Sequence, residues 1–181
     1  MLKKEYWDTH DSSGLCKNYP DKFDEWWDAD LFDWDKYSWA LVKYCKDYFN
    51  IWWDKDKFNY NRCSYVLAEY CSSYFSKWWD AEKYNYADGS CFLAEFCSEH
   101  FNEWWDESKF NWESSWYLAE FCSDYIAIWW NTHKFNWESA INDLHYGWLH
   151  ECPEVGLKQM LFHNIPEVRD IAKEELNRRL Q

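Results

Sequence analysis

The chain contains only four Gly and three Pro among its 181 residues. So few glycines argue against a glycine-rich phosphate-binding loop and a nucleophile elbow, because both motifs need glycine at fixed positions. No segment rich in Pro, Gly or Ser divides the sequence, so we expect one domain over residues 1–181. The sequence also lacks HExxH and CxxC motifs, which removes two common signatures of metal binding.

Long apolar runs are missing as well. No run reaches about eighteen apolar residues, the length that spans a bilayer. The first residues, MLKKEYWDTHDSSG, lack the apolar segment of a signal peptide, although a secreted chain after removal of its signal peptide would look the same. We therefore expect no membrane-spanning segment and no membrane partner.

Catalytic side chains form no recognisable group in the sequence. His145 and His150 would point about 140° apart on a helix, whereas helical metal-binding pairs are four residues apart. The carboxylates of Glu69, Glu95 and Glu120 recur at one repeat position, while a catalytic acid and base need two different environments. We therefore expect no enzymatic activity, no cofactor and no metal site.

Positive charge is scarce, and the chain carries a formal net charge of -14. Residues 1–151 contain 28 acidic and 14 basic residues, whereas residues 152–181 contain five of each. A negative field of this kind repels nucleic acids and anionic membranes and attracts basic proteins or cations. We expect a basic protein partner and no direct binding of nucleic acid.

The sequence has instead a tandem repeat rich in Trp. Its clear copies are WWDKDKFNY from Trp52, WWDAEKYNY from Trp78, WWDESKFNW from Trp104 and WWNTHKFNW from Trp129, and a weaker copy, WWDADLFDW, starts at Trp26. The spacings of 26, 26, 26 and 25 residues are typical of stacked repeats, which present a long binding face. Three parts are expected: a degenerate N-terminal cap (1–25), the Trp-pair repeats (26–137) and a C-terminal helical cap (138–181).

Each repeat has the pattern of one helix followed by one short turn. In residues 111–130, apolar side chains recur at helical spacing, which predicts a helix of about four to five turns that includes Phe121, Cys122 and the Trp pair. The expected N-cap residues are Asp33, Asn59, Asn85, Asn111 and Asn136. A second set of caps, each for a single turn or 3₁₀ helix, consists of Asp28, Asp54, Asp80, Asp106 and Asn131. The aromatic side chains expected to point inward from those turns are Phe58, Tyr84, Phe110 and Phe135, each preceded by an outward Lys.

This alternation of a helix with a short turn resembles the layout of leucine-rich-variant repeats, a class of right-handed α-solenoids related to HEAT repeats. Those families use Leu and Val where this chain uses Trp and Tyr. The tail has PEVR at 166–169, followed by Ile171, Ala172 and Leu176, which resembles the PEVRxxAxxxL pattern of HEAT-like repeats. The resemblance implies an all-α fold, a right-handed α-solenoid of about five 26-residue repeats with helical caps.

Both ends of the array are expected to differ from the repeats. Residues 153–163 should form a helix that pairs with the tail helix. In the N-terminal cap, Gly14 and Pro20 are expected to interrupt the helix. Repeat arrays need such atypical ends to cover the apolar faces of their last units.

Four of the eight Cys occupy one repeat position, namely Cys45, Cys71, Cys97 and Cys122. Neighbouring helices in a stack lie about 8–10 Å apart, whereas a disulfide needs Cα atoms within about 7 Å. We therefore expect buried, unpaired thiols. Such thiols fit a reducing compartment and favour the cytoplasm, which would be that of the host cell if the protein is viral.

The Trp pairs supply the candidate binding residues. The first Trp of each pair is expected in the core, whereas the second lies near the edge of the apolar arc. The second either packs against the next repeat or joins an exposed aromatic ladder that could recognise a ligand. The candidates are Trp53, Trp79, Trp105 and Trp130, the capping residues Asp54, Asp80 and Asp106, and the recurring Glu69, Glu95 and Glu120.

The most favoured function is a non-enzymatic scaffold that binds a protein through an acidic and aromatic face. In one version, its spaced carboxylates imitate nucleic acid and block a basic nucleic-acid-binding protein, as small acidic viral inhibitors of host defence do. The alternatives are a carbohydrate-binding module that stacks Trp and Tyr on sugars, and a structural assembly subunit. The sequence leaves the oligomeric state open.

Overall fold

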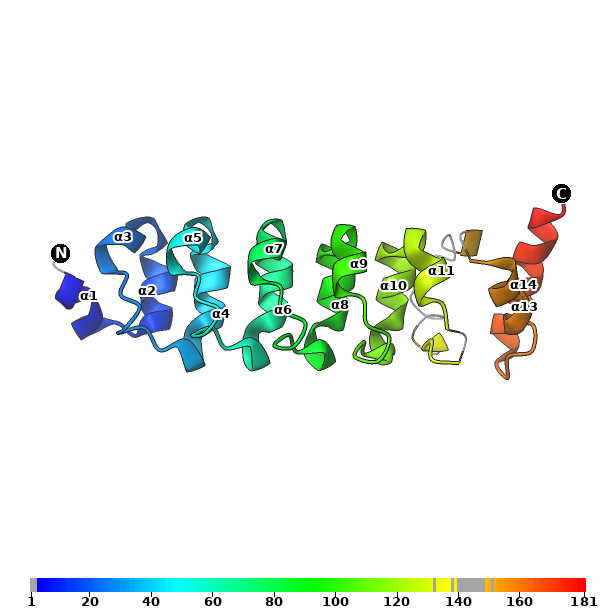
Figure 1. Cartoon of the computed structure of the whole chain (residues 1–181), viewed down its shortest axis with the longest axis horizontal. Coiled ribbons are helices and arrows are strands. Elements are labelled where there is room, and N and C mark those ends of the chain that lie inside the picture. The colour runs from blue at the N-terminus through cyan, green and yellow to red at the C-terminus, as the bar shows by residue number, and fades with distance from the viewer. Residues whose placement is uncertain (1–2, 132, 138, 140–148, 151) are drawn as a thin grey trace. The chain divides into compact units, whose positions relative to one another are not determined.

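The computed structural model describes residues 3–131, 133–137, 139, 149–150 and 152–181. Over these residues the protein is all-α, and none of them belongs to a strand (Figure 1). The chain divides into two compact units, Met1–Asn85 and Tyr86–Gln181, and each is described here by itself. That the chain is one domain stays a prediction.

Unit 1 contains three successive sets of helices. Its α-helices are α1 (Lys3–Thr9), α2 (Ser12–Asn18), α3 (Phe23–Trp26), α4 (Trp34–Tyr44), α5 (Phe49–Trp52), α6 (Tyr60–Cys71) and α7 (Phe75–Trp78). Its 3₁₀ helices are η1 (Pro20–Lys22), η2 (Lys46–Tyr48) and η3 (Ser72–Tyr74). The longer helices α2, α4 and α6 contact one another in that order.

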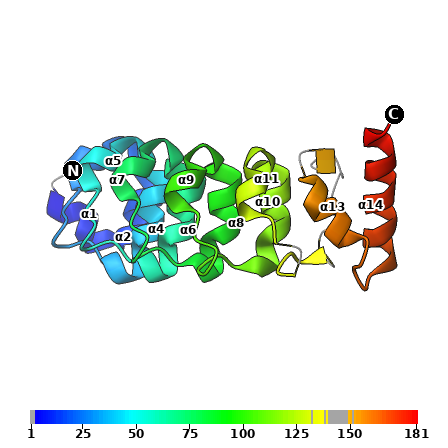
Figure 2. The same cartoon turned by 45° about the vertical axis from the view of Figure 1, so that its right-hand side comes forward.

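Unit 2 continues the same pattern and ends in a helix pair. Its α-helices are α8 (Tyr86–Phe96), α9 (Phe101–Trp104), α10 (Ser115–Phe121), α11 (Ile126–Trp129), α13 (Glu154–Met160) and α14 (Pro166–Arg179). Its 3₁₀ helices are η4 (Ser98–His100), η5 (Trp112–Ser114) and η6 (Ser123–Tyr125). Helices α8 and α10 lie side by side, and so do α13 and α14, as Figures 1 and 2 both show.

The predicted helix over residues 111–130 is wrong in one respect, because the structure divides it into η5, α10, η6 and α11. The main break falls at Cys122, whose backbone leaves the helical range at φ -125° and ψ 29°. Cys45, Cys71 and Cys97 adopt nearly the same angles. The apolar spacing hides this break, since both sides of it are equally apolar. In Figure 1 the short helix α7 consequently lies beside the upper end of α6 rather than extending it.

The caps predicted from the sequence explain where the elements begin. The side chains of Asp33, Asn59 and Asn111 each accept a hydrogen bond from a first-turn amide of the helix that follows. Asn136 accepts one from the amide of Ser139 at 3.2 Å. The prediction for these N-caps is confirmed.

Two predictions about the ends of the chain need correction. Gly14 does not interrupt a helix, because it lies in the first turn of α2, where its amide donates to the Asp11 side chain at 2.7 Å. Pro20 does mark a boundary, since it opens η1. The helix predicted over 153–163 is present but shorter, as α13, and the tail helix α14 starts at Pro166 as expected. Residues 140–148, part of the expected C-terminal cap, lie outside the described residues.

The core is built on the first Trp of each pair, as predicted. Trp26, Trp52, Trp78, Trp104 and Trp129 are 0–1% exposed. The inward aromatic residues of the turns, Phe58, Tyr84, Phe110 and Phe135, are also buried. Large rigid rings therefore supply most of the buried apolar area.

The cysteines behave as expected. All eight are unpaired thiols, and the column of Cys45, Cys71, Cys97 and Cys122 is buried. Burial raises the pKa of Cys71, Cys97 and Cys122 to about 12, which keeps these thiols protonated and unreactive. In the described part of the chain, no helix is long and apolar enough to cross a membrane.

Candidate functional site

The second Trp of each pair is half-buried among rings close to it in sequence. The Trp53 ring stacks on Phe49 with centroids 5.1 Å apart and contacts Phe58 at 5.3 Å. It also meets the edge of Tyr60, the first residue of α6, at 6.1 Å. Trp79 likewise stacks on Phe75 and contacts Tyr84, and Trp105 stacks on Phe101 and contacts Phe110. These indoles therefore pack against neighbouring rings and remain partly exposed to solvent. Their role in binding stays a prediction.

Trp130 differs because helix α13 approaches it closely. A Cβ atom added at Gly156 would lie 2.5 Å from Trp130 Nε1, closer than side-chain atoms pack. Trp130 also contacts Phe135 at 5.5 Å and Trp137 at 5.7 Å. Glycine at position 156 is therefore what allows α13 to pack on this indole.

The candidate Asp residues cap the short turns, as predicted. Asp54 Oδ1 accepts from the amides of Asp56 at 3.0 Å and Lys57 at 3.3 Å, and Asp80 makes the same pair of bonds. Asp106 accepts from the hydroxyl and the amide of Ser108, which hold the pKa of its carboxyl below the usual value. One oxygen of each carboxylate is thus used locally.

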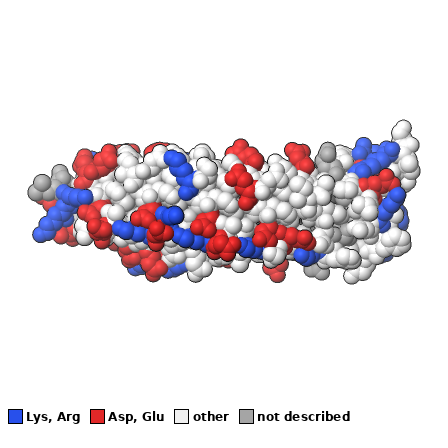
Figure 3. Space-filling model, viewed as in Figure 1, with Lys and Arg blue, Asp and Glu red and all other residues white. Residues whose placement is uncertain are grey.

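The Lys of three of the turns pairs with an acid one repeat earlier. Lys57 Nζ lies 3.2 Å from Asp30, Lys83 Nζ lies 3.1 Å from Asp56, and Lys134 Nζ lies 3.0 Å from Glu107. In Figure 3, blue and red atoms accordingly alternate in a stripe over the turns of each unit. Each exposed pair contributes at most about 1 kcal/mol, and each neutralises one carboxylate of the turns.

The candidate Glu residues lie on the accessible side of the long helices. Glu69 on α6 hydrogen-bonds Tyr70, and this bond is the main reason that the pKa of Tyr70 is raised. Glu95 on α8 is half-exposed and Glu120 on α10 is exposed. Burial raises the pKa of Tyr117, and the charges of Glu95 and Glu120 raise it further. Carboxylates from two helices therefore act on one phenol.

These helices also carry accessible aromatic side chains that the sequence did not single out, since Phe121 follows the apolar spacing of its helix. Phe121 is 36% exposed. The half-exposed residues around it are Phe92, Phe96, Trp116 and Tyr117, and those in unit 1 are Trp39, Tyr44, Tyr65 and Tyr70. The sequence does contain a pattern that marks these positions. Each Cys of the column is preceded by an aromatic residue, and that residue by a charged one, namely Lys43, Glu69, Glu95 or Glu120.

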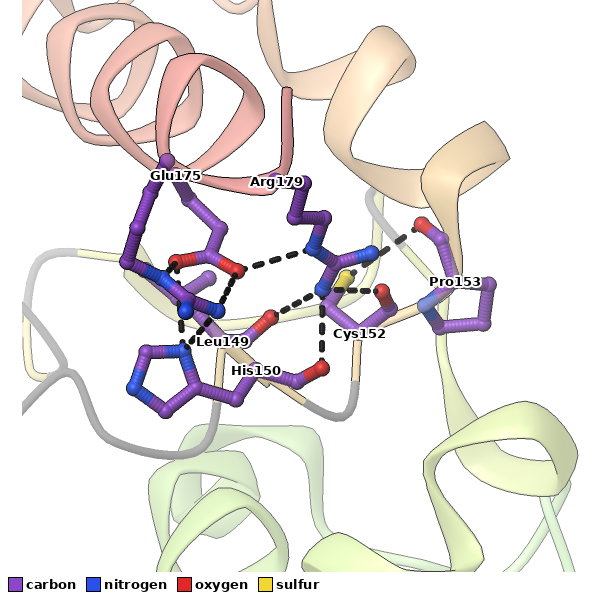
Figure 4. A network of polar contacts seen from close by, with 7 residues as sticks. Leu149, His150, Cys152, Pro153, Glu175 and Arg179 are labelled. Atoms are coloured by element: carbon purple, nitrogen blue, oxygen red, sulfur yellow. Dashed lines mark hydrogen bonds and ion pairs between the residues drawn. The ribbon is translucent and has the colours of Figure 1, made fainter. Parts of the chain in front are cut away.

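A network of charged groups around the buried Glu175 lies at the C-terminal end of unit 2. Glu175 of α14 is 6% exposed and lies 2.8 Å from both Arg178 and Arg179 and 3.2 Å from His150. Arg179 also donates to the carbonyls of Leu149, His150 and Cys152, as Figure 4 shows. Bonds to the arginines lower the pKa of Glu175 to about 2. Every group in this cluster has a partner within it, so we assign it a structural role.

Two further features of the described residues are their possible metal ligands and a cleft lined partly by histidines. In the residues that the structure describes, no group of three or more His, Cys, Asp and Glu side chains is placed to hold a metal ion. His145, weighed as a ligand from the sequence, lies outside the described residues. An open cleft of about 400 Å³ is lined by His133, Gln159, Phe162, His163 and Asn164. The pKa of His163 is lowered, mainly because the side chain is partly buried. Its imidazole is therefore mostly neutral near pH 7.

Comparison with known proteins adds no family to this description. No protein-family model, no curated protein and no solved structure matches the chain. The function therefore rests on the contacts and charges of its own residues.

Proposed function

We propose that the chain is a non-enzymatic, right-handed α-solenoid of about five repeats that binds a basic protein partner through an acidic and aromatic surface. The proposal has two parts, the stacking of the repeats and the chemistry of their exposed side. Contacts between repeats support the first part, and the distribution of charge supports the second.

A column of buried Ser residues supports the stacking. Ser90 Oγ donates to the carbonyl of Tyr86 at 2.6 Å and accepts from the amide of Asn111, the next N-cap, at 2.9 Å. We call this bond from a backbone amide to a Ser hydroxyl of the preceding longer helix the Ser clamp. The same N···Oγ bond, 2.8–3.1 Å long, joins Ser12 to Asp33, Ser38 to Asn59, Ser64 to Asn85 and Ser115 to Asn136. Each clamp ties one helix to the start of the next, as a solenoid requires.

Ring stacking supports the same arrangement at the opposite end of the helices. Tyr48, Tyr74 and Tyr125 each stack on the Phe of the preceding repeat. The pairs are Phe23 with Tyr48, Phe49 with Tyr74 and Phe101 with Tyr125, with centroids 4.5–4.7 Å apart. At these three places the repeats are joined by two kinds of contact, a polar one near the N-cap and an aromatic one near the short helix.

The charge of residues 84–133 is the observation that carries the binding proposal. This stretch contains nine Asp and Glu but a single Lys, Lys109, and no Arg. Glu99, Glu103, Glu113, Glu120 and Asp124 are exposed. An exposed surface of one sign steers partners of the opposite sign and disfavours others. A basic protein fits it better than a neutral glycan does.

Affinity capture tests the proposal. The immobilised full chain is incubated with a cell lysate and eluted with stepped salt, and the proteins released are identified by mass spectrometry. We expect a basic protein that is released by salt, because screening weakens exposed charge contacts. Retention of no protein above the bare matrix would overturn the proposal, and glycan retention or self-association would favour the two alternatives.

Matched variants make the test specific. The first replaces Glu113, Glu120 and Asp124 by Gln, Gln and Asn, and should lose the partner. The control replaces Glu167, Asp170 and Glu174 of α14 in the same way, removes equal charge and should retain the partner. If the partner binds nucleic acid, added duplex should compete with the chain in the mimicry version of the proposal.

A further inference from the structure

We propose that the accessible side of α8 and α10 is the docking surface, and that its occupant is an arginine-rich segment of the partner protein. This inference rests on the proposed function and adds to it the surface and the chemistry of recognition. We name the surface the aromatic–acidic face and define it by Phe92, Phe96, Trp116, Tyr117, Phe121, Glu95 and Glu120.

The rings of this face form one contacting set on each of two adjacent helices. On α8 the rings of Phe92 and Phe96 stack with centroids 6.3 Å apart. On α10 the Tyr117 ring lies 3.8 Å from Trp116 and 6.1 Å from Phe121. All five are half-exposed or exposed. Since rigid aromatic side chains lose little entropy when they are covered, such a set is typical of recognition surfaces.

The carboxylates of the face define the sign of its ligand. Glu95 comes from α8 and Glu120 from α10, and the negative charges of both help to raise the pKa of Tyr117. Neither α8, η5 nor α10 contains Lys or Arg. A planar guanidinium can stack on a ring and hydrogen-bond a carboxylate at the same time, which an ammonium group does less well.

The chain itself contains the interaction that we propose. Lys43 of α4 occupies the repeat position of Glu95 and Glu120, two residues before the Cys of the column. Its Nζ lies 5.8 Å from the ring centroid of Tyr44, the residue equivalent to Phe96 and Phe121. On α4 the chain therefore places a cation at this position, whereas on α6, α8 and α10 a carboxylate occupies it. A cationic partner segment would place the same kind of charge over the rings of α8 and α10.

Two other occupants fit this face poorly. A second copy of the chain carries the same net charge of -14, and two faces that each carry Glu95 and Glu120 would repel each other. An anionic membrane surface would be repelled for the same reason. Charge complementarity thus selects a cationic peptide segment.

A titration of the full chain with a labelled alternating Arg-Ser peptide tests the inference. Binding is followed by fluorescence anisotropy at low salt, with the corresponding Lys-Ser and Glu-Ser peptides for comparison. We expect the Arg peptide to bind more tightly than the Lys peptide, and the Glu peptide not to bind. Failure of the wild-type chain to bind the Arg peptide would overturn the inference.

The variants separate this face from general attraction by charge. The double variant Glu95→Lys and Glu120→Lys reproduces the natural Lys43 arrangement and should weaken binding of the Arg peptide about tenfold or more. The control Glu167→Lys and Glu174→Lys changes the net charge equally and should leave binding within about twofold. Trp116→Leu with Tyr117→Leu keeps the charge, and we expect it to weaken binding several-fold through the loss of cation–π contacts.

The outcomes distinguish the inference from the proposed function. If the α14 control weakens binding as much as the face variant, or if the Leu variant binds normally, this face is not the docking surface. The proposed function would still stand if the wild-type chain retained a basic protein from the lysate. If no basic protein is retained, the proposed function itself fails. Thermal denaturation of each variant confirms that it is folded.

Discussion

Trp104 Nε1 donates a hydrogen bond of 2.8 Å to the main-chain carbonyl of Cys97, the residue at which α8 has just ended. The carbonyls at a helix end have no partner within the helix, and this indole supplies one. The same hydrogen bond, to the carbonyl seven residues earlier and 2.7–2.8 Å long, joins Trp26 to Tyr19, Trp52 to Cys45, Trp78 to Cys71 and Trp129 to Cys122. The first Trp of each pair is therefore both core and helix cap.

Replacing Trp104 should show both contributions. Trp104→Phe keeps an aromatic ring but leaves the buried carbonyl without its donor, which we expect to cost about 1–3 kcal/mol. Trp104→Ala also opens a cavity, and we expect a loss of about 3–5 kcal/mol. Urea denaturation measures both free energies of unfolding. Trp39→Phe, on a half-exposed ring, is the control, and equal midpoints for Trp104→Phe and wild type would refute the capping role.

Asn59 has a second task that Asp could not perform. Its Oδ1 caps α6 by accepting from Arg62, and its Nδ2 donates to the carbonyl of Asp35 at 2.8 Å and to the Asp35 carboxylate at 2.7 Å. Asn59→Asp would keep the cap but replace the donor by a second negative charge. We expect a loss of about 1–3 kcal/mol, whereas Asp33→Asn should change little because both residues cap well. Chemical denaturation at neutral pH gives the free energy of unfolding of both variants. Equal losses would contradict the contribution of the Asn59 Nδ2 hydrogen bonds.

Ser90 should be less tolerant of substitution than an exposed Ser. Ser90→Ala removes the acceptor of the Asn111 amide in a position that is 1% exposed. The amide is then left without this bond, which we expect to cost about 1–3 kcal/mol. Ser73→Ala, at an exposed position of η3, should stay within about 0.5 kcal/mol of wild type. Comparable unfolding curves for the two variants would remove the basis for the Ser clamp.

Glu175 makes the C-terminal helix pair sensitive to acid. Its pKa is lowered from 4.5 to about 2 by Arg178 and Arg179, so the folded state binds this proton less readily than the unfolded state. A lowered pKa stabilises the fold fully above the unfolded value and loses that effect as the pH falls toward 2. The protection of the α14 amides against hydrogen exchange, measured relative to the intrinsic exchange rate at each pH, should therefore fall between about pH 5 and pH 2.

Glu175→Gln provides the control for this pH dependence. It should exchange faster than wild type at neutral pH, because Arg178 and Arg179 lose their carboxylate partner. The difference between the variant and wild type should shrink as the pH approaches 2, where Glu175 itself becomes neutral. A difference that does not change with pH would show that the carboxylate charge is not the cause.

The sequence by itself determined the local features of each repeat. The caps at Asn59 and Asp54, the inward ring at Phe58 and the buried first Trp all follow from residues within a few positions of one another. Such hydrogen bonds and apolar spacings act over one or two helical turns. The buried, unpaired state of the Cys column was predictable because the repeat period sets its helix spacing.

Only the tertiary structure decided where the long helix breaks and what its outer side presents. The break depends on an indole that returns to a carbonyl seven residues earlier, and apolar periodicity is the same with or without it. The Ser clamp joins residues 21 apart, and the Lys pairs join residues 27 apart. Whether Phe121 is core or surface depends on which neighbours cover it. These features follow from burial and from contacts between repeats, which a single repeat does not encode.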